Sequence, residues 1–390
     1  MSTPKLSSTK RQQIKEALAS GKSHREIADS LKVSVGTVAN VKALAEDARA
    51  SRAESQAKAA KKAYGEALSR IAELEDDLSA TQSAVVCAEQ CVPMGFDVRP
   101  KAKRHEAVPV MVWSDFHLDE VVDPSAMNGL NEFNPTIAQE RMNRLMACTT
   151  SVLRIYQQNS DINTAIVAIL GDLITGWIHD DNVSSNELTP PEGIVAAISF
   201  LTGALQTLLT EFPDMQFIVV EAPGNHGRIT LKVPHKKSAR KNLEHIVYSV
   251  LARHFANEPR VKFRPPAGDM NWLTVMGRPT RWLHGTGIKY LGGIGGPTVG
   301  ILKAIRAWDT GQKAALTVAG HLHTPLSDLR SYVWNGALKG YDEFARDVVK
   351  AEFSLASQVM FLLHQKYWLT GIYSIKVQDV GNSPDFQVSG

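Results

Sequence analysis

The stretch VPVMVWSDFH, residues 108–117, joins a short apolar run to the motif Asp-x-His. An apolar run of this length bounded by polar residues predicts a buried β-strand over residues 108–113. Similar runs predict strands over 165–170, 216–221, 281–284 and 315–319, with further β-structure over 356–363 and 371–377. Amphipathic segments predict helices over 136–157, 191–209, 238–255 and 297–308. Strands that alternate with helices predict an α/β fold.

Five of these strands end in side chains of the kinds that bind metal ions. In chain order the strand ends carry Asp115-Phe116-His117, Gly171-Asp172, Gly224-Asn225-His226, His284-Gly285 and Gly320-His321-Leu322-His323. Any one of these motifs is common by chance. Because the carboxyl ends of strands gather at one edge of an α/β sheet, we expect the side chains to converge there. Oxygen and imidazole ligands without thiolate suit Mn²⁺, Fe, Zn²⁺ or Ni²⁺.

Taken in order, the array D-x-H, G-D, G-N-H, H-G and G-H-x-H over residues 108–335 resembles the calcineurin-like metallophosphoesterase superfamily, which includes SbcD-like nucleases. The resemblance implies a four-layer βαββα-type sandwich with two divalent cations, for which Mn²⁺ is expected and Fe, Zn²⁺ or Ni²⁺ are alternatives. It implies one cation on Asp115, His117, Asp172 and His323, and the other on Asp172, Asn225, His284 and His321. His226 then resembles the catalytic histidine that protonates the leaving oxygen while a metal-bridging hydroxide attacks.

The sequence departs from the family pattern at two places beside the site. Gly227 and Arg228 follow His226 where the family usually has an acidic residue, and Thr175 stands where many members have an aspartate. The carboxylate that usually orients the catalytic histidine is therefore either missing or supplied from elsewhere, with residues 180–187 as one source. The missing G-D-x-V-D-R-G motif argues against the phosphoprotein phosphatase branch. The segment WNGALKGYDE, residues 334–343, resembles metallophosphoesterases of bacteriophage and prophage origin.

Basic residues follow the third motif closely. Residues 225–260 contain eight Lys and Arg side chains against two Glu, and Arg228 and Lys232 are predicted to contact substrate phosphate. A basic loop beside an active-site motif favours a polyanionic substrate. The alternative is an ordinary solvated helical face.

The first 46 residues form a separate basic segment, with eight Lys and Arg against four Asp and Glu. Apolar spacing over residues 8–46 predicts three short helices with breaks at 20–23 and 32–34, a capping box at Ser23 and Glu26, and a cap at Ser34. The stretch SHREIADSLKVSVGTVANVK, residues 23–42, resembles the helix-turn-helix of resolvases. That resemblance implies DNA contacts from Arg25, Lys32, Ser34, Gly36, Thr37, Asn40 and Lys42. A three-helix bundle for protein contacts is the alternative.

Residues 47–91 are expected to form a helical spacer, because residues 47–85 are rich in Ala, Glu, Lys and Arg and contain no Pro. A 3,4 spacing of small and apolar residues runs from Ala50 to Val85, which predicts a coiled-coil homodimer or else a single solvated helix. Pro, Gly and basic residues predict a linker over 92–107, followed by the phosphoesterase domain over 108–390.

Cellular location follows from what the sequence lacks. The three cysteines are too few for a disulfide framework, and neither a signal peptide nor a long uninterrupted apolar stretch is apparent. We therefore expect a cytoplasmic protein of a bacterial or phage-infected cell, with no membrane partner.

The expected function is a two-metal phosphodiesterase, a nuclease acting on DNA. The alternatives are a phosphomonoesterase on a nucleotide or phosphoprotein, and a DNA-binding phage protein with a vestigial phosphoesterase domain.

Overall fold

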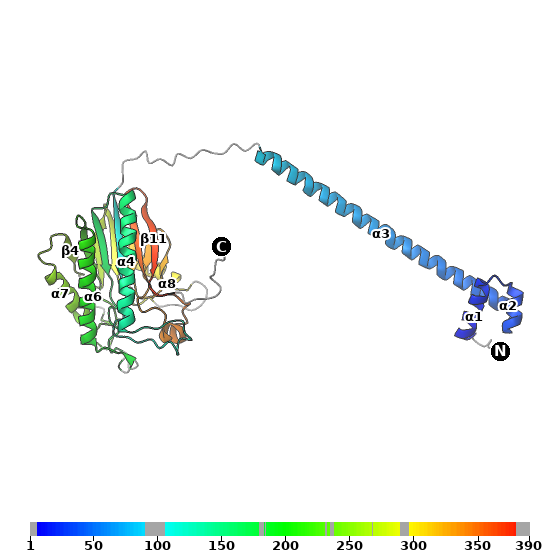
Figure 1. The fold of residues 1–390 in the computed structure, drawn as a ribbon, viewed down its shortest axis with the longest axis horizontal. Helices are drawn as coiled ribbons and strands as arrows, with labels where there is room; N and C mark the ends of the chain where they lie inside the picture. The colour runs from blue at the N-terminus through cyan, green and yellow to red at the C-terminus, as the bar shows by residue number, and fades with distance from the viewer. Residues whose placement is uncertain are drawn as a thin grey trace. The chain divides into compact units, whose positions relative to one another are not determined.

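The computed structural model describes residues 6–89, 106–178, 183, 185–230, 232–234, 238–266, 268–288 and 296–379, and side chains 83–89 and 159 are excepted. The chain divides into two compact units, Met1–Pro100 and Lys101–Gly390, which are described separately (Figure 1). Nearly all of the predicted linker, Cys91 and residues 179–182 and 184 lie outside the described residues.

The N-terminal unit consists of α1 (Ser8–Ala19), α2 (His24–Leu31) and α3 (Val35–Glu89). Its small core is formed by Ile14, Ile27, Ala28, Val38 and Val41. The capping box of Ser23 and Glu26 is present, and the Ser34 hydroxyl accepts a hydrogen bond from Thr37 N at 3.1 Å.

The third helix does not end where the spacer was expected to begin. α3 is one helix of 55 residues that runs through position 46 without a break. The reason is local, because residues 37–64 contain neither Gly nor Pro and are dominated by strong helix formers.

The C-terminal unit is built around two mixed sheets, which confirms the mixed α/β fold. The first has the order β11-β10-β1-β2-β3-β4, in which β1 to β4 are parallel and β10 and β11 are antiparallel additions. Its strands are β1 (Ala107–Trp113), β2 (Thr164–Ile169), β3 (Gln216–Glu221), β4 (Val261–Arg264), β10 (Ser357–His364) and β11 (Trp368–Lys376).

The second sheet has the order β5-β6-β7-β9-β8. Its strands are β5 (Met270–Val275), β6 (Arg278–Leu283), β7 (Leu316–Ala319), β8 (Leu326–Ser327) and β9 (Tyr332–Trp334). The sequence did not predict β4, β5, β8 or β9, because strands as short as two to four residues carry no readable alternation, and β5 mixes polar with apolar residues.

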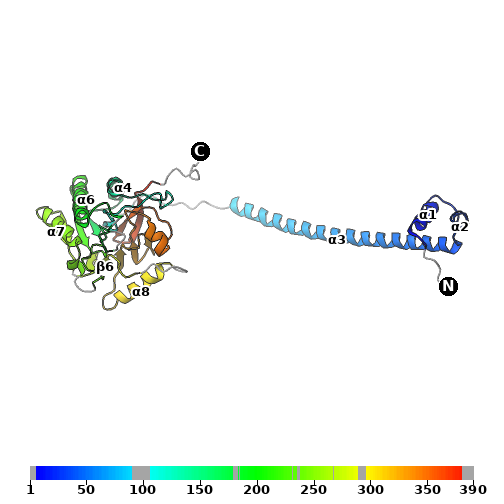
Figure 2. The same ribbon diagram turned by 90° about the horizontal axis from the view of Figure 1, so that it is seen from below.

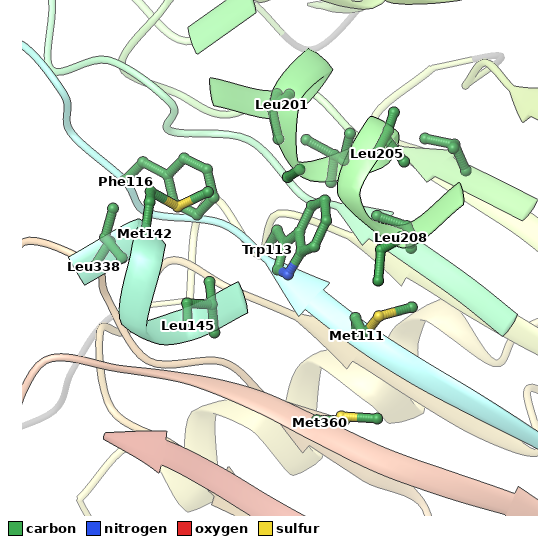
Figure 3. Packing of buried hydrophobic residues seen from close by; sticks show 14 of the residues in the cluster. Met111, Trp113, Phe116, Met142, Leu145, Leu201, Leu205, Leu208, Leu338 and Met360 are labelled. Carbon is green, nitrogen blue, oxygen red and sulfur yellow. The ribbon is translucent and has the colours of Figure 1, made fainter. Parts of the chain in front are cut away.

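Alternating residues of β1 enter two different cores. Met111 and Trp113 face α4 (Pro135–Asn159) and α6 (Pro190–Glu211), whose Met142, Leu145, Leu201 and Leu205 surround them (Figure 3). Val110 and Val112 belong to a second cluster, which includes Trp282 and Val318 of the other sheet. A strand that is apolar on both faces is therefore covered on both faces.

Two more helices complete the unit. The expected helix over residues 238–255 is divided into η1 (Ser238–Lys241) and α7 (Glu244–His254), and α7 packs with α6. α8 (Thr298–Trp308) packs against β7 and β9 through Ile301, on the opposite side of the unit from α4 and α6 (Figure 2). A π-helical turn, η2 (Phe344–Val349), precedes β10.

Among the described residues, α6 alone is long and apolar enough to cross a membrane, judged by length and composition. Its buried side chains, including Leu201, Leu205 and Leu208, pack in the core beside β1. This burial explains its apolar composition.

Candidate metal centre

The loops after five strands meet at one edge of the two sheets. In the first sheet, Asp115 N donates a hydrogen bond to the Gly171 carbonyl at 2.9 Å, which joins the loops after β1 and β2. In the second sheet, Gly320 N donates to the His284 carbonyl at 2.9 Å, which joins the loops after β6 and β7. Parallel strands in register thus bring distant motifs together at their carboxyl ends.

The structure gathers six of the predicted ligands into two groups. The members of each group offer ligand atoms that lie within 4.8 Å of one another: Asp115, His117 and His323 in one, and Asp172, His284 and His321 in the other. His323 Nε2 lies 3.3 Å from Asp115 Oδ1, and His284 Nε2 lies 2.8 Å from Asp172 Oδ2. The first group holds three residues of the first implied ligand set and the second group holds three residues of the second, while Asp172, which was expected in both sets, stands in the second group.

Asn225, the seventh predicted ligand, lies at the second group. Its Oδ1 is 3.1 Å from His284 Nε2 and accepts a hydrogen bond from the Thr286 hydroxyl at 3.4 Å. An amide oxygen is a hard donor of the kind that divalent cations accept.

Imidazole nitrogens face one another in both groups. His117 Nε2 lies 3.2 Å from His323 Nε2, and His284 Nε2 lies 3.2 Å from His321 Nδ1. His284 Nδ1 lies 2.7 Å from the Leu170 carbonyl, so in the neutral ring Nδ1 carries the proton and Nε2 carries a lone pair. Because lone pairs of imidazole and carboxylate converge on the same point, the donor set fits a divalent cation in each group.

The pKa values of the second group show that the Asp172 carboxylate stabilises a positive charge next to it. Burial opposes the charged form of His284, yet the Asp172 carboxylate outweighs it and raises the pKa of His284 to about 10. Burial and the charge on His284 lower the pKa of His321 to about 3. The buried carboxylate thus draws a proton into the place where a metal ion would lie.

Thr175 replaces the expected aspartate and is connected to a carboxylate. Its hydroxyl donates to Glu120 Oε2 at 2.5 Å and lies 2.7 Å from His117 Nδ1. The Thr175 hydroxyl donates its hydrogen bond to Glu120. Its oxygen therefore accepts a hydrogen bond from Nδ1–H of His117, which leaves the lone pair of Nε2 available to bind a cation. Glu120 is therefore connected through Thr175 to His117, a candidate ligand, and not to His226.

Glu120 is neutralised by a buried lysine. Lys339 Nζ lies 2.9 Å from both Glu120 carboxylate oxygens and 2.5 Å from Asp342 Oδ2. These carboxylates raise the pKa of Lys339 despite its burial, so the ammonium stays charged. Lys339 thus connects the segment 334–343 to Glu120, and Glu120 is connected through Thr175 to His117.

Several ligand residues have an unusual backbone conformation. Five of the predicted ligands have φ between 50° and 74°: Asp115, His117, Asp172, His321 and His323. Non-glycine residues seldom adopt positive φ, and such residues cluster where surrounding contacts over-determine the backbone. One such contact is His321 N, which donates to Asp115 Oδ1 at 2.9 Å.

His226 stands beside the first group without belonging to it. Its ring packs edge-on against His117 with centroids 4.9 Å apart, and its backbone N–H donates to Asp172 Oδ1 at 2.8 Å. Nδ1 lies 3.0 Å from the Thr175 carbonyl, which accepts the Nδ1 proton. A backbone carbonyl of Thr175 therefore orients this ring, in place of the aspartate side chain that the family pattern suggested.

Two buried acids hold the loops in place, and the sequence reasoning missed both. Glu244 accepts hydrogen bonds from Leu173 N and Gly224 N, each at 2.8 Å, and burial raises its pKa to about 7. Asp119 accepts hydrogen bonds from Thr175 N at 2.6 Å and Gly176 N at 2.8 Å. A local signal exists for Lys339, because a charged residue inside the apolar and glycine-rich segment GALKGY suggests a buried ion pair.

The described basic side chains of residues 225–260 differ in exposure and in partners. Arg228 is half-buried and donates to the Asn225 carbonyl at 2.7 Å, whereas Lys232 is exposed. Arg260 pairs with Glu258 at 2.8 Å and donates to the Leu209 and Pro213 carbonyls, so it has a structural role. Lys236 and Lys237 lie outside the described residues.

The predicted DNA-contacting residues belong to the N-terminal unit. Arg25, Lys32, Ser34, Gly36, Asn40 and Lys42 are exposed, and Thr37 is half-buried. Lys42 Nζ lies 3.9 Å from Glu46 Oε1 on α3, and an exposed ion pair of this kind contributes little to stability.

Comparisons with known proteins leave the family open. No protein-family model matches the chain, and no curated protein matches it. The chain is similar to a solved structure of Vps29 from Entamoeba histolytica complexed with zinc, at 9% identity and a TM-score of 0.27, covering 70% of this chain and 100% of that one. A hypothetical protein from Pyrococcus horikoshii matches at 10% identity and a TM-score of 0.32, covering 70% and 89%. At such TM-scores neither similarity assigns a function.

Proposed function

We propose that the C-terminal unit is a two-metal phosphodiesterase of the calcineurin-like type, a four-layer βαββα sandwich that acts on DNA with Mn²⁺ as the expected cation. The observation that carries this proposal is the pairing of two ligand groups at one sheet edge with His226 beside them. A vestigial site would have lost members of the set, whereas the sequence retains all seven candidate ligands.

The proposal assigns one cation to Asp115, His117, Asp172 and His323, and the other to Asp172, Asn225, His284 and His321. When bound, two such cations supply Lewis-acid activation of the attacking water and neutralise the phosphate charge. The protein supplies fixed ligand geometry, because Thr175 and Leu170 hold the outer nitrogens of His117 and His284.

His226 is proposed to move a proton to the leaving oxygen. The Thr175 carbonyl keeps a proton on Nδ1, so Nε2 is the nitrogen available to the substrate. The imidazolium gives its Nε2 proton to the leaving oxygen and becomes the neutral ring, a state that burial favours by lowering the pKa of His226.

Residues around His226 support a nucleic-acid substrate. Lys232 and the half-buried Arg228 place positive charge on the loop after His226. Trp177 is 52% exposed and follows Gly176, the residue next to the Thr175 carbonyl that holds His226. Gly176 lies against the His226 backbone, and an exposed indole next to it suits stacking on an unpaired base.

The N-terminal unit is proposed to bind DNA as a helix-turn-helix. The exposed Arg25, Lys32 and Lys42 would contact phosphates, and Asn40 and Gly36 on the first turns of α3 would face bases. This unit would deliver the phosphodiesterase to its substrate.

One assay panel tests the proposal. The full chain is supplied with Mn²⁺ and given single-stranded DNA, duplex DNA, a phosphodiester reporter and a phosphomonoester reporter. We expect hydrolysis of DNA and of the diester, and a loss of about 10³-fold or more in Asp172→Ala. The exposed Asp214→Ala is the matched control and should leave the rate unchanged.

The outcomes separate the alternatives. Cleavage of the monoester alone overturns the diesterase proposal in favour of a phosphomonoesterase. Bound metal without hydrolysis of any substrate favours a DNA-binding protein with a vestigial centre.

A further inference from the structure

The long helix α3 leaves a row of large apolar side chains in solvent. Tyr64 is 67% exposed, Ile71 and Leu74 are each 51% exposed, and Leu78 is 57% exposed. From residue 46 to residue 82, every side chain of α3 is exposed. A helix in a protein gains most of its stability by packing an apolar face, so we expect this face of α3 to pack against another polypeptide segment.

The row follows a heptad repeat. Positions a are Ala50, Ala57, Tyr64, Ile71 and Leu78, and positions d are Ala53, Ala60, Ala67, Leu74 and Thr81. Alternating steps of three and four residues keep one seam facing a partner helix in a left-handed coiled coil. β-branched Ile71 at a with Leu74 at d is the combination that favours two parallel strands.

The charges that flank the seam are complementary to those of a second copy in parallel register. In a parallel coiled coil, position g of one helix lies beside the position five residues later on its partner. Two of these pairs are opposite in sign: Arg49 with Glu54, and Arg70 with Glu75. The remaining pairs carry at most one charge each: Gln56 with Lys61, Ala63 with Leu68, and Asp77 with Gln82.

We propose that α3 forms a parallel, in-register coiled-coil homodimer. Parallel pairing places Ile71, Leu74 and Leu78 against their own counterparts, and no flanking pair repels. Antiparallel overlap of the same segment would instead face these bulky residues with the alanines of positions 50–60. The proposal stands on α3 alone and does not require the phosphodiesterase activity.

Parallel pairing has a consequence for α1 and α2. Both copies of these helices then lie at the same end of the coiled coil. If the unit binds DNA as proposed above, the dimer presents two basic modules to a two-fold site.

The test combines mass with cysteine cross-linking of the full chain. Sedimentation equilibrium should give about twice the monomer mass of 42.7 kDa. In a background of Cys87→Ala, Cys91→Ala and Cys148→Ser, we expect Ala60→Cys and Leu74→Cys each to form a disulfide-linked dimer. These d positions are about 21 Å apart along the helix, so an antiparallel pair can cross-link at only one of them.

Ser69→Cys, on the opposite face of α3, is the matched control and should stay uncross-linked. A monomer mass at 100 µM overturns the proposal, as does cross-linking at only one of the two d positions.

Charge exchange gives a second readout. Arg70→Glu should raise the dimer dissociation constant about fivefold, because it replaces an attraction with a repulsion on both sides of the coil. Adding Glu75→Arg should restore the affinity. Arg70 also pairs with Glu73 of its own helix at 2.7 Å, and a loss that comes from this pair would not be restored. Failure of the double variant to recover overturns the parallel register.

Discussion

The ligand loops of the C-terminal unit and the helix α3 are built in opposite ways. The loops hold five non-glycine residues at positive φ, and their conformation is fixed by partners far away in the sequence, such as Thr175 for His117 and Glu244 for Gly224. α3 has ordinary helical backbone, and its ion pairs join residues three or four positions apart, as in Lys58 with Glu54. The candidate metal centre therefore lies where local conformational preferences are overridden, whereas local preferences alone account for the helical conformation of α3.

Replacing one glycine in each region by alanine tests this comparison most directly. A Cβ at Gly320 would overlap Asp115 Oδ2 and Ser114 Oγ, whereas a Cβ at Gly65 of α3 meets nothing within 4 Å. We expect Gly320→Ala to lower the free energy of unfolding by about 2–3 kcal/mol and to abolish metal binding by displacing Asp115. Gly65→Ala should raise helix stability by about 1 kcal/mol. Thermal unfolding and metal titration of both variants check this, and equal effects would contradict the contrast.

A second test concerns the hydrogen bonds by which Thr175 connects Glu120 to His117. Thr175→Val keeps the shape of the side chain and removes the oxygen between Glu120 and His117. We expect Mn²⁺ affinity to fall about 10–100-fold, the usual cost of losing a partner of a metal ligand. Thr175→Ser retains the hydroxyl and is the matched control. Isothermal titration measures both, and unchanged affinity in the valine variant would show that these hydrogen bonds do not support metal binding.

The N-terminal surface is expected to respond through charge alone. Replacing Arg25, Lys32 and Lys42 by Gln should weaken binding to DNA about tenfold and lower the slope of log K against log[salt] by about 3. Hydrolysis of a small diester reporter should stay the same. Fluorescence anisotropy over a salt series measures the slope, and an unchanged slope would show that this face does not contact phosphates.

The smallest effect is expected at the rim of the metal centre. Trp177→Ala should lower kcat/KM about fivefold for a thymidine p-nitrophenyl phosphodiester, because stacking on the base is lost. Hydrolysis of methyl p-nitrophenyl phosphate, which has no base, should not change. Trp177→Phe should recover most of the difference. An equal fall for both reporters would assign Trp177 a structural role.

The sequence predicted the convergence of residues that follow directly after strands. Six of the candidate ligands come together as expected, since a strand fixes the edge of the sheet at which its last residues emerge. The supporting residues could not be found this way. Glu120 and Lys339 are 219 positions apart, and although a lysine inside GALKGY is unusual, nothing near it in the sequence identifies Glu120 as its partner.

The division of α3 was predicted wrongly for a related reason. The resemblance of residues 23–42 suggested a short third helix, whereas helix propensity beyond residue 42 favoured continuation, and the continuous helix is observed. The short strands β8 and β9 were missed because two or three residues cannot show a period.

The sequence by itself determined the α/β alternation, the identities of the seven candidate ligands and the long helix, because periodicity and helix propensity are properties of neighbouring residues. Only the tertiary structure decided which buried residues support the candidate ligands and how closely the ligand atoms approach, since two imidazoles meet at 3.2 Å only after strands far apart in sequence lie in register. Only the tertiary structure showed that Thr175, which stands where the family pattern has an aspartate, connects Glu120 to His117.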